Sequence, residues 1–159
     1  MDQPDWIALA VFVGLNLATA SSGSVFKPGA WYAGLSKPSW TPPNLAFPIV
    51  WSLLFAMNAA AGWLVWEAVG TTSPLAFGLY VGSLMLNAGW SWLFFGRRRM
   101  DLALVNVALL WLSLVAIIAV FWGLRPLAAL LLIPYLTWVT IASALNLRML
   151  QLNRVTQPN

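Results

Sequence analysis

The sequence predicts an all-α membrane protein, built as a bundle of five transmembrane helices in a single domain. Of its 159 residues, 61% are hydrophobic and 8% are charged, and the mean hydropathy is +0.81. Soluble domains carry roughly 25% charged residues, so this composition is typical of a chain whose solvent is lipid. The charged residues also leave five uncharged stretches, at 6–26, 38–66, 68–96, 102–124 and 126–147. Each is long enough for one helical crossing, which needs about 20 residues, and too short for two.

The stretches are expected to cross as helices, because every backbone N–H and C=O in hydrocarbon must be paired within the protein. A transmembrane barrel would need alternating segments of roughly 10 residues, which the sequence does not contain. Helices are therefore predicted at about 5–25, 46–68, 74–96, 101–123 and 127–151.

The first helix resembles a cleavable signal peptide only in being apolar and early in the chain. Its flank carries Asp2 and Asp5 instead of basic residues, and its apolar run is long, so we expect a retained helix. Further along, Gly70 and Pro74 separate the second helix from the third. Gly123 and Pro126 separate the fourth from the fifth in the same way, since glycine ends helices and proline starts them.

The long connection 26–45 is predicted to fold as a lid. It is rich in proline, and loops beyond about 12–15 residues are usually functional or disordered. Disordered segments are poor in aromatic residues, whereas this one holds Trp31, Tyr32 and Trp40 beside Pro42.

The distribution of lysine and arginine predicts the orientation. Every basic residue except Arg125 falls in the loops after the first and third helices or near the C-terminus. The positive-inside rule then places the C-terminus and the lid in the cytoplasm and the N-terminus outside. The same asymmetry, without a transit peptide, favours a bacterial inner membrane. The basic cluster is interpreted as a topology determinant near anionic lipid, with no nucleic acid as partner.

Missing residue types exclude several kinds of chemistry. The chain has no His and no Cys, so we expect no metal site, no disulfide and no required cofactor. All four carboxylates fall at helix ends or near the termini, which disfavours a proton-driven pump and hydrolysis. Each predicted helix instead carries a neutral asparagine, which either pairs helices or contacts a ligand: Asn16, Asn58, Asn87, Asn106 and Asn146.

Helical periodicity places aromatic and polar residues on shared faces. Positions four or seven apart lie on one side of a helix. The second helix aligns Phe47, Trp51, Phe55 and Asn58, and the fifth aligns Pro134, Trp138, Ala142 and Asn146. Tryptophan at span ends also forms interfacial belts, but Trp51 and Trp138 share their faces with polar or small residues. A ligand wall and a belt therefore both remain open for these two residues.

The third helix has two different sides. One carries Tyr80, Asn87, Trp90 and Phe94, and the opposite side carries Gly78, Gly82 and Gly89. Small residues four apart allow two helices to approach closely, either within one chain or between two. The glycine side is therefore a candidate homodimer interface.

Several motifs resemble those of the translocator protein / tryptophan-rich sensory protein (TspO/MBR) family. The most specific block runs from Trp31-Tyr32 through Lys37-Pro38-Ser39-Trp40-Thr41-Pro42-Pro43 to Phe47-Pro48-x-x-Trp51. Further matches are Leu86-Asn87 with Trp90, Pro134-Tyr135-Leu136-x-Trp138, and Ala142 with Leu145-Asn146. The resemblance extends from about Val13 to Arg148.

The resemblance implies a five-helix membrane protein, usually a homodimer, that binds tetrapyrroles such as protoporphyrin IX. By the family's pattern, the ligand-binding residues would be Trp31, Tyr32, Trp40, Pro42, Phe47, Trp51, Asn87, Trp138 and Ala142. Two departures matter. Phe55 stands where many members have tyrosine, and the cholesterol motif lacks its tyrosine before Arg148.

The expected function is that of a membrane receptor or transporter for tetrapyrroles, with protoporphyrin IX as ligand and membrane lipids as further partners. The alternative is an enzyme that degrades porphyrin in light, with Trp51 and Trp138 as candidate catalytic residues. A third possibility is a structural or partner-regulating protein whose pocket holds lipid.

Overall fold

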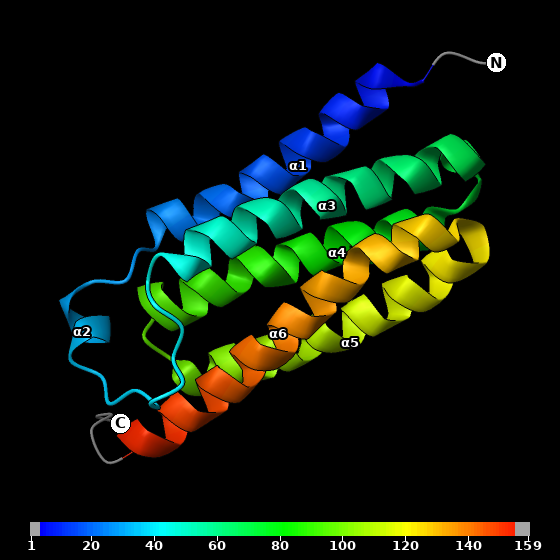
Figure 1. The fold of residues 1–159 in the computed structure, drawn as a ribbon. Helices are drawn as coiled ribbons and strands as arrows, with labels where there is room; N and C mark the ends of the chain where they lie inside the picture. The colour runs from blue at the N-terminus through cyan, green and yellow to red at the C-terminus, as the bar shows by residue number, and fades with distance from the viewer. Residues whose placement is uncertain (1–3, 155–159) are drawn as a thin grey trace.

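The computed structural model describes residues 4–154, and every regular element in that range is helical. Five long helices lie side by side, and one short helix sits at an end of the bundle (Figure 1). The long helices are α1 (Trp6–Val25), α3 (Ala46–Val69), α4 (Pro74–Ser91), α5 (Met100–Leu124) and α6 (Pro126–Asn153). The short elements are α2 (Ala30–Ala33), the 3₁₀ turn η1 (Gly70–Thr72) and the π-helical turn η2 (Trp92–Gly96).

Four of the long helices, α1, α3, α5 and α6, are long and apolar enough to cross a membrane. The predicted membrane class is thereby confirmed at the level of an all-helical chain with several apolar helices. Helix α4 is the shortest of the five, at 18 residues, and it carries Tyr80, Ser83 and Asn87 on its buried side. These polar side chains make it less apolar than the others.

The helix boundaries follow the local signals in the sequence. Asp5 caps α1, with its carboxylate accepting a hydrogen bond from the Ala8 N–H at 2.9 Å. Pro74 and Pro126 occupy the first positions of α4 and α6, where a proline sacrifices no helical hydrogen bond. Gly70 ends α3 with a φ of 53°, a conformation that favours glycine.

The segment predicted as one helix over 74–96 changes register near its end. The regular α-helix stops at Ser91, and the following turn widens so that the Arg97 N–H donates to the Trp92 carbonyl at 2.8 Å. Such π turns shift the direction of the side chains that follow. The lid also contains regular structure, since α2 forms within the predicted loop 26–45.

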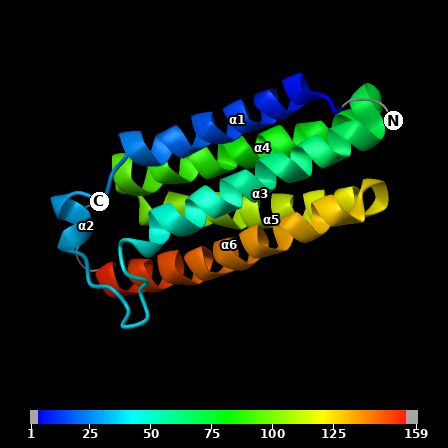
Figure 2. The same ribbon diagram turned by 45° about the horizontal axis from the view of Figure 1, so that its top comes forward.

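The long helices close into a ring. Helix α1 packs against α3 and α4, α3 packs against α6, and α5 packs against both α4 and α6 (Figures 1 and 2). The C-terminal ends of α1, α4 and α6 gather at the same end of the bundle as α2, and the N-terminus lies at the other end. The two ends of the ring are packed differently.

The end away from α2 is filled by side chains. Phe12, Tyr80 and Phe121 pack ring against ring there, at centroid distances of 5.3 Å for Phe12–Tyr80 and 6.5 Å for Tyr80–Phe121. All three are buried, with Tyr80 and Phe121 fully so. Gly62 lies where α3 approaches this cluster, and a Cβ atom there would fall 2.6 Å from the Phe12 ring. This half of the bundle is a close-packed core.

Candidate functional site

The half of the ring near α2 encloses a cavity of about 810 Å³. Its lining residues come from α1, from the first half of α3, from the end of α4 with η2, and from the second half of α6. No charged residue is among them. Small-molecule sites in proteins have volumes of about 300–1,000 Å³ and mostly apolar walls, so both the size and the lining suit an organic ligand.

Two tryptophans stand on facing helices of the cavity wall. Trp51 of α3 stacks on Phe55 at 5.4 Å and meets the edge of Tyr135 from α6 at 5.8 Å. Trp138 of α6 lies edge to face with Phe47 at 5.7 Å. These contacts hold the rings in place, which gives the cavity a rigid aromatic surface.

The π turn builds a second aromatic wall. Phe94 stacks on Trp90 at 4.9 Å, and its neighbour Phe95 lies at a steep angle to it at the same separation. Consecutive residues of an α-helix point about 100° apart, yet both phenylalanines line the cavity here. The wider turn therefore places two adjacent rings on one side, where Tyr32 of α2 covers them at 6.4 and 5.5 Å.

A buried polar cluster separates the cavity from the close-packed half. The Asn16 amide of α1 donates to the Tyr80 hydroxyl at 2.6 Å and accepts from the Asn58 amide at 2.8 Å. Tyr80 in turn donates to the Asn58 carbonyl at 3.1 Å. The cluster joins three helices without a charge, in agreement with the pairing role considered for these asparagines.

Asn87 occupies the opposite wall. Its amide N–H donates to the Tyr135 hydroxyl at 2.7 Å, while its carbonyl oxygen accepts no hydrogen bond from residues 4–154. Because Asn87 lines the cavity, this acceptor and the Tyr135 hydroxyl hydrogen are polar groups that a ligand can use.

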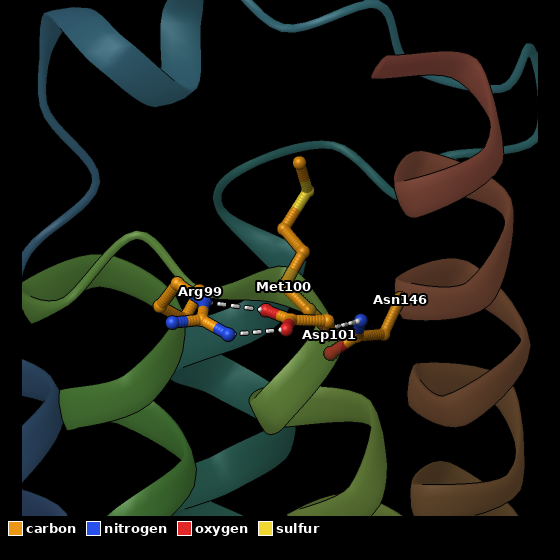
Figure 3. A network of polar contacts seen from close by, with 4 residues as sticks. All are labelled: Arg99, Met100, Asp101 and Asn146. Carbon is orange, nitrogen blue, oxygen red and sulfur yellow. Dashed lines mark hydrogen bonds and ion pairs between the residues drawn. The ribbon is translucent and has the colours of Figure 1, made fainter. Parts of the chain in front are cut away.

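Asn146 holds the cavity wall to the start of α5. Its amide donates to the Met100 carbonyl at 2.9 Å and its oxygen accepts from the Trp90 indole at 3.1 Å. Figure 3 shows this residue beside the Arg99–Asp101 ion pair, which is 2.6 Å long. The ion pair lies on the surface, outside the cavity lining.

The lid covers the cavity through α2. Tyr32 is buried, and its exclusion from water raises the pKa of its hydroxyl. The Lys37 ammonium lies 4.7 Å above the Tyr32 ring and donates to the Ala33 and Leu35 carbonyls. Tyr32 is therefore the lid residue that faces the interior.

The structure brings six of the nine sequence-predicted ligand residues to one cavity: Tyr32, Phe47, Trp51, Asn87, Trp138 and Ala142. Three others lie outside its lining. Trp31 packs against the edge of Phe94 at 5.8 Å, Trp40 is half exposed, and Pro42 lies in the chain after it. Their role in ligand binding remains a prediction.

The three glycines proposed for a dimer face differ in their surroundings. Gly78 and Gly82 have open space where a Cβ atom would be. A Cβ atom at Gly89 would fall 3.3 Å from the Asn106 amide, so this glycine packs against α5 of the same chain. Only the first two present an unobstructed surface.

Other lining residues were not predicted as ligand contacts. They include the π-turn pair Phe94 and Phe95, together with Trp90, Phe55, Asn16 and Asn146. Helical periodicity had placed four of these on the right faces, but it could not bring Phe95 to the wall because that position depends on the π turn. No group of three acidic, His or Cys residues is present within 4–154 that could hold a metal ion.

Comparison with known proteins identifies the family. The sequence profile described as TspO/MBR family matches residues 6–152. A tryptophan-rich sensory protein from Cereibacter sphaeroides is 37% identical over 149 residues, covering 94% of this chain and 93% of that protein. Tryptophan-rich protein TspO from Chlorobaculum tepidum is 43% identical over 158 residues (92% and 96%), and the translocator protein of Homo sapiens is 38% identical over 149 (90% and 88%).

The fold and the cavity define the class as a helical membrane protein with an uncharged internal pocket. Within that class, this chain belongs to the TspO/MBR family.

Proposed function

We propose that this protein is an integral membrane receptor or transporter that binds tetrapyrroles, with protoporphyrin IX as the test ligand. The observation that carries the proposal is the uncharged cavity of about 810 Å³ with Trp51 and Trp138 in its walls. A flat aromatic macrocycle gains affinity by stacking on such rings and by leaving water, without needing a charge at depth. Family membership supports the same reading.

The residue roles follow from the lining. The macrocycle stacks on Trp51 and Trp138, and the free carbonyl oxygen of Asn87 accepts a pyrrole N–H. The propionates point toward the basic end of the bundle. Lys27 is exposed there, whereas the Lys37 ammonium is held by the lid itself, which makes Lys27 the better partner.

In the bilayer, the chain crosses five times. Helix α4 continues into η2, so the pair provides an uninterrupted helical run over 74–96 for the fifth crossing. The ends of α1 and α6 then lie on opposite sides, with the N-terminus outside and the basic, lid-bearing end in the cytoplasm of a bacterial cell. Two copies associate through the open glycine face of α4, among membrane lipids and without nucleic acid as a partner.

The test is a titration of purified protein in lipid nanodiscs with protoporphyrin IX, followed by tryptophan fluorescence. Trp138→Ala is expected to weaken binding by about tenfold, because it removes a stacking surface. Trp122→Ala is the matched control, since Trp122 is exposed on α5 and lies outside the cavity. Equal loss in both variants, or no saturable binding to wild type, would contradict the proposal and favour a lipid-filled pocket.

Haem provides a second arm of this experiment. The chain contains no His or Cys to act as a strong axial ligand, so metal-free porphyrin should bind at least as tightly as haem. Much tighter haem binding, with the spectral shift of an axial ligand, would contradict that expectation.

The alternative function is the light-driven oxidation of bound porphyrin by dioxygen. It is favoured by one observation, that Trp51 and Trp138 line the same cavity. Illumination of the complex should then yield product in wild type and in Trp122→Phe, but not in Trp51→Phe or Trp138→Phe. Bleaching at the rate of free porphyrin in all four proteins would exclude catalysis.

A further inference from the structure

Asn153, in the last turn of α6, holds the lid by both main-chain groups of one residue. Its side-chain oxygen accepts from the Ser36 N–H at 3.0 Å, and its amide donates to the Ser36 carbonyl at 2.9 Å. The two residues are 117 positions apart in sequence. A single side chain that satisfies an N–H and a C=O together imitates the pairing of a β-strand.

The asparagine is itself fixed in place. It is buried to 4% exposure, and its amide also donates to the Met149 carbonyl one turn earlier at 2.8 Å. A buried hydrogen bond of this kind contributes more than an exposed one, because breaking it leaves desolvated groups unpaired. The Asn153–Ser36 pair is therefore a strong point in an otherwise irregular loop.

The pair is connected to the part of the lid that covers the cavity. Ser36 is followed by Lys37, whose ammonium binds the end of α2 and lies over the Tyr32 ring. Tyr32 lines the cavity, whereas neither Asn153 nor Ser36 does. Release of Ser36 would loosen α2 without altering any group that faces a bound ligand.

We propose that Asn153 is a positioning residue that latches the lid and sets the rates at which ligand enters and leaves the cavity. This inference rests on the proposed function for its ligand. Because Asn153 is remote from the ligand, loss of the latch raises the association and dissociation rates by the same factor and leaves Kd nearly unchanged. A change that merely damaged the site would alter Kd as well.

The experiment combines two readouts on the full chain in nanodiscs. Hydrogen–deuterium exchange of residues 26–45 reports opening of the lid without any ligand. Stopped-flow fluorescence with protoporphyrin IX reports both rates. For Asn153→Ala we expect faster exchange in this segment and about a tenfold increase in each rate, from the loss of two buried hydrogen bonds.

Three further variants sharpen the test. Gln151→Ala changes an exposed residue of the same turn and should behave as wild type. Ser36→Ala should also be silent, since the latch uses only main-chain atoms of Ser36. Asn153→Asp retains an acceptor for the Ser36 N–H but has no N–H to donate, so its rates should lie between those of wild type and Asn153→Ala. It also serves if the alanine variant does not fold.

The outcomes separate the two proposals. Unchanged exchange in Asn153→Ala would overturn the latch. Faster exchange with unchanged ligand rates would overturn its role in ligand access. Faster exchange in a protein whose wild type never binds porphyrin would overturn the proposed function while supporting the latch itself.

Discussion

At the scale of single residues, the tightest constraint lies where α3 meets the aromatic cluster of the close-packed half. Gly62 is buried, and a Cβ atom there would lie 2.6 Å from the Phe12 ring and 3.0 Å from the Tyr80 ring. Protein interiors transmit such overlaps instead of absorbing them, because they are packed as densely as organic crystals. The spacing of α1, α3 and α4 thus depends on one missing side chain.

Gly62→Ala is expected to lower the free energy of unfolding by about 1–3 kcal/mol, since the rings must move to admit the methyl group. Gly14→Ala is the control, because a Cβ atom at Gly14 meets nothing within 4 Å. It should stay within about 0.5 kcal/mol of wild type. Unfolding in detergent, followed by circular dichroism, measures both. Equal stability of the two variants would contradict this account of the packing.

At the scale of helices, the start of α1 is tied to the end of α3 by one carboxylate. Asp5 accepts from the Ala8 N–H at 2.9 Å and from the Trp66 indole at 2.9 Å, and its main-chain carbonyl accepts from the Trp63 indole at 3.2 Å. These side-chain hydrogen bonds, chiefly the one from Ala8, hold the pKa of Asp5 below its usual range. The cap therefore favours the ionised form in the folded state.

A depressed folded-state pKa predicts acid sensitivity of this helix start. The stabilisation is present above the unfolded pKa of about 3.9 and is lost as the pH falls through the lower folded value. Asp5→Asn keeps a capping oxygen but removes the charge, so its Tm should be below that of wild type at pH 7. The difference should shrink as the pH falls below about 4. A pH-independent difference in thermal unfolding would contradict the linkage to Asp5.

Two elements at the α2 end show what helical periodicity misses. The sequence predicts one helix over 74–96, and the structure keeps those limits but widens the last turn into η2. The segment predicted as loop 26–45 contains α2, which brings Tyr32 over the cavity. Both differences depend on contacts outside the local sequence. A Cβ atom at Gly96, for example, would fall 2.9 Å from the Phe26 ring.

At the scale of the whole molecule, the ring of helices is hollow at one end and filled at the other. The cavity lies next to the lid, and the cluster of Asn16, Asn58 and Tyr80 closes it toward the filled half. Passage of a large ligand along the bundle axis would require these buried bonds and the ring packing beyond them to break. The arrangement therefore favours a receptor that exchanges ligand at its lid-bearing end.

The open glycine face of α4 predicts how two copies associate. Gly82→Leu should weaken dimerisation by about tenfold or more, because a bulky side chain prevents close helix approach. Gly14→Leu is the control, since Gly14 also has open space around it but lies on α1. Analytical ultracentrifugation in detergent measures the dimer fraction. An unaffected dimer in Gly82→Leu would place the interface elsewhere.

Much of the helix pattern and half of the candidate site could be predicted from the sequence. The predicted ranges agree with the observed long helices to within a few residues, since glycine, proline and charge mark their ends. Trp51 and Trp138 were placed on inward faces by spacing alone, and both line the cavity. Trp40 shows the limit of such reasoning. It belongs to the same motif, yet it is half exposed, because no periodicity governs an irregular loop.

The sequence by itself determined that the chain is an apolar helical membrane protein with aromatic inner faces, a basic end and no residues for metal ligation by His or Cys. Those properties follow from composition and from the 3.6-residue period, which are local. Only the tertiary structure decided that the space between the helices is empty at one end, that Phe95 and Tyr32 border it, and that Asn153 holds Ser36. These features depend on contacts between distant segments and on one π turn, so no local pattern encodes them.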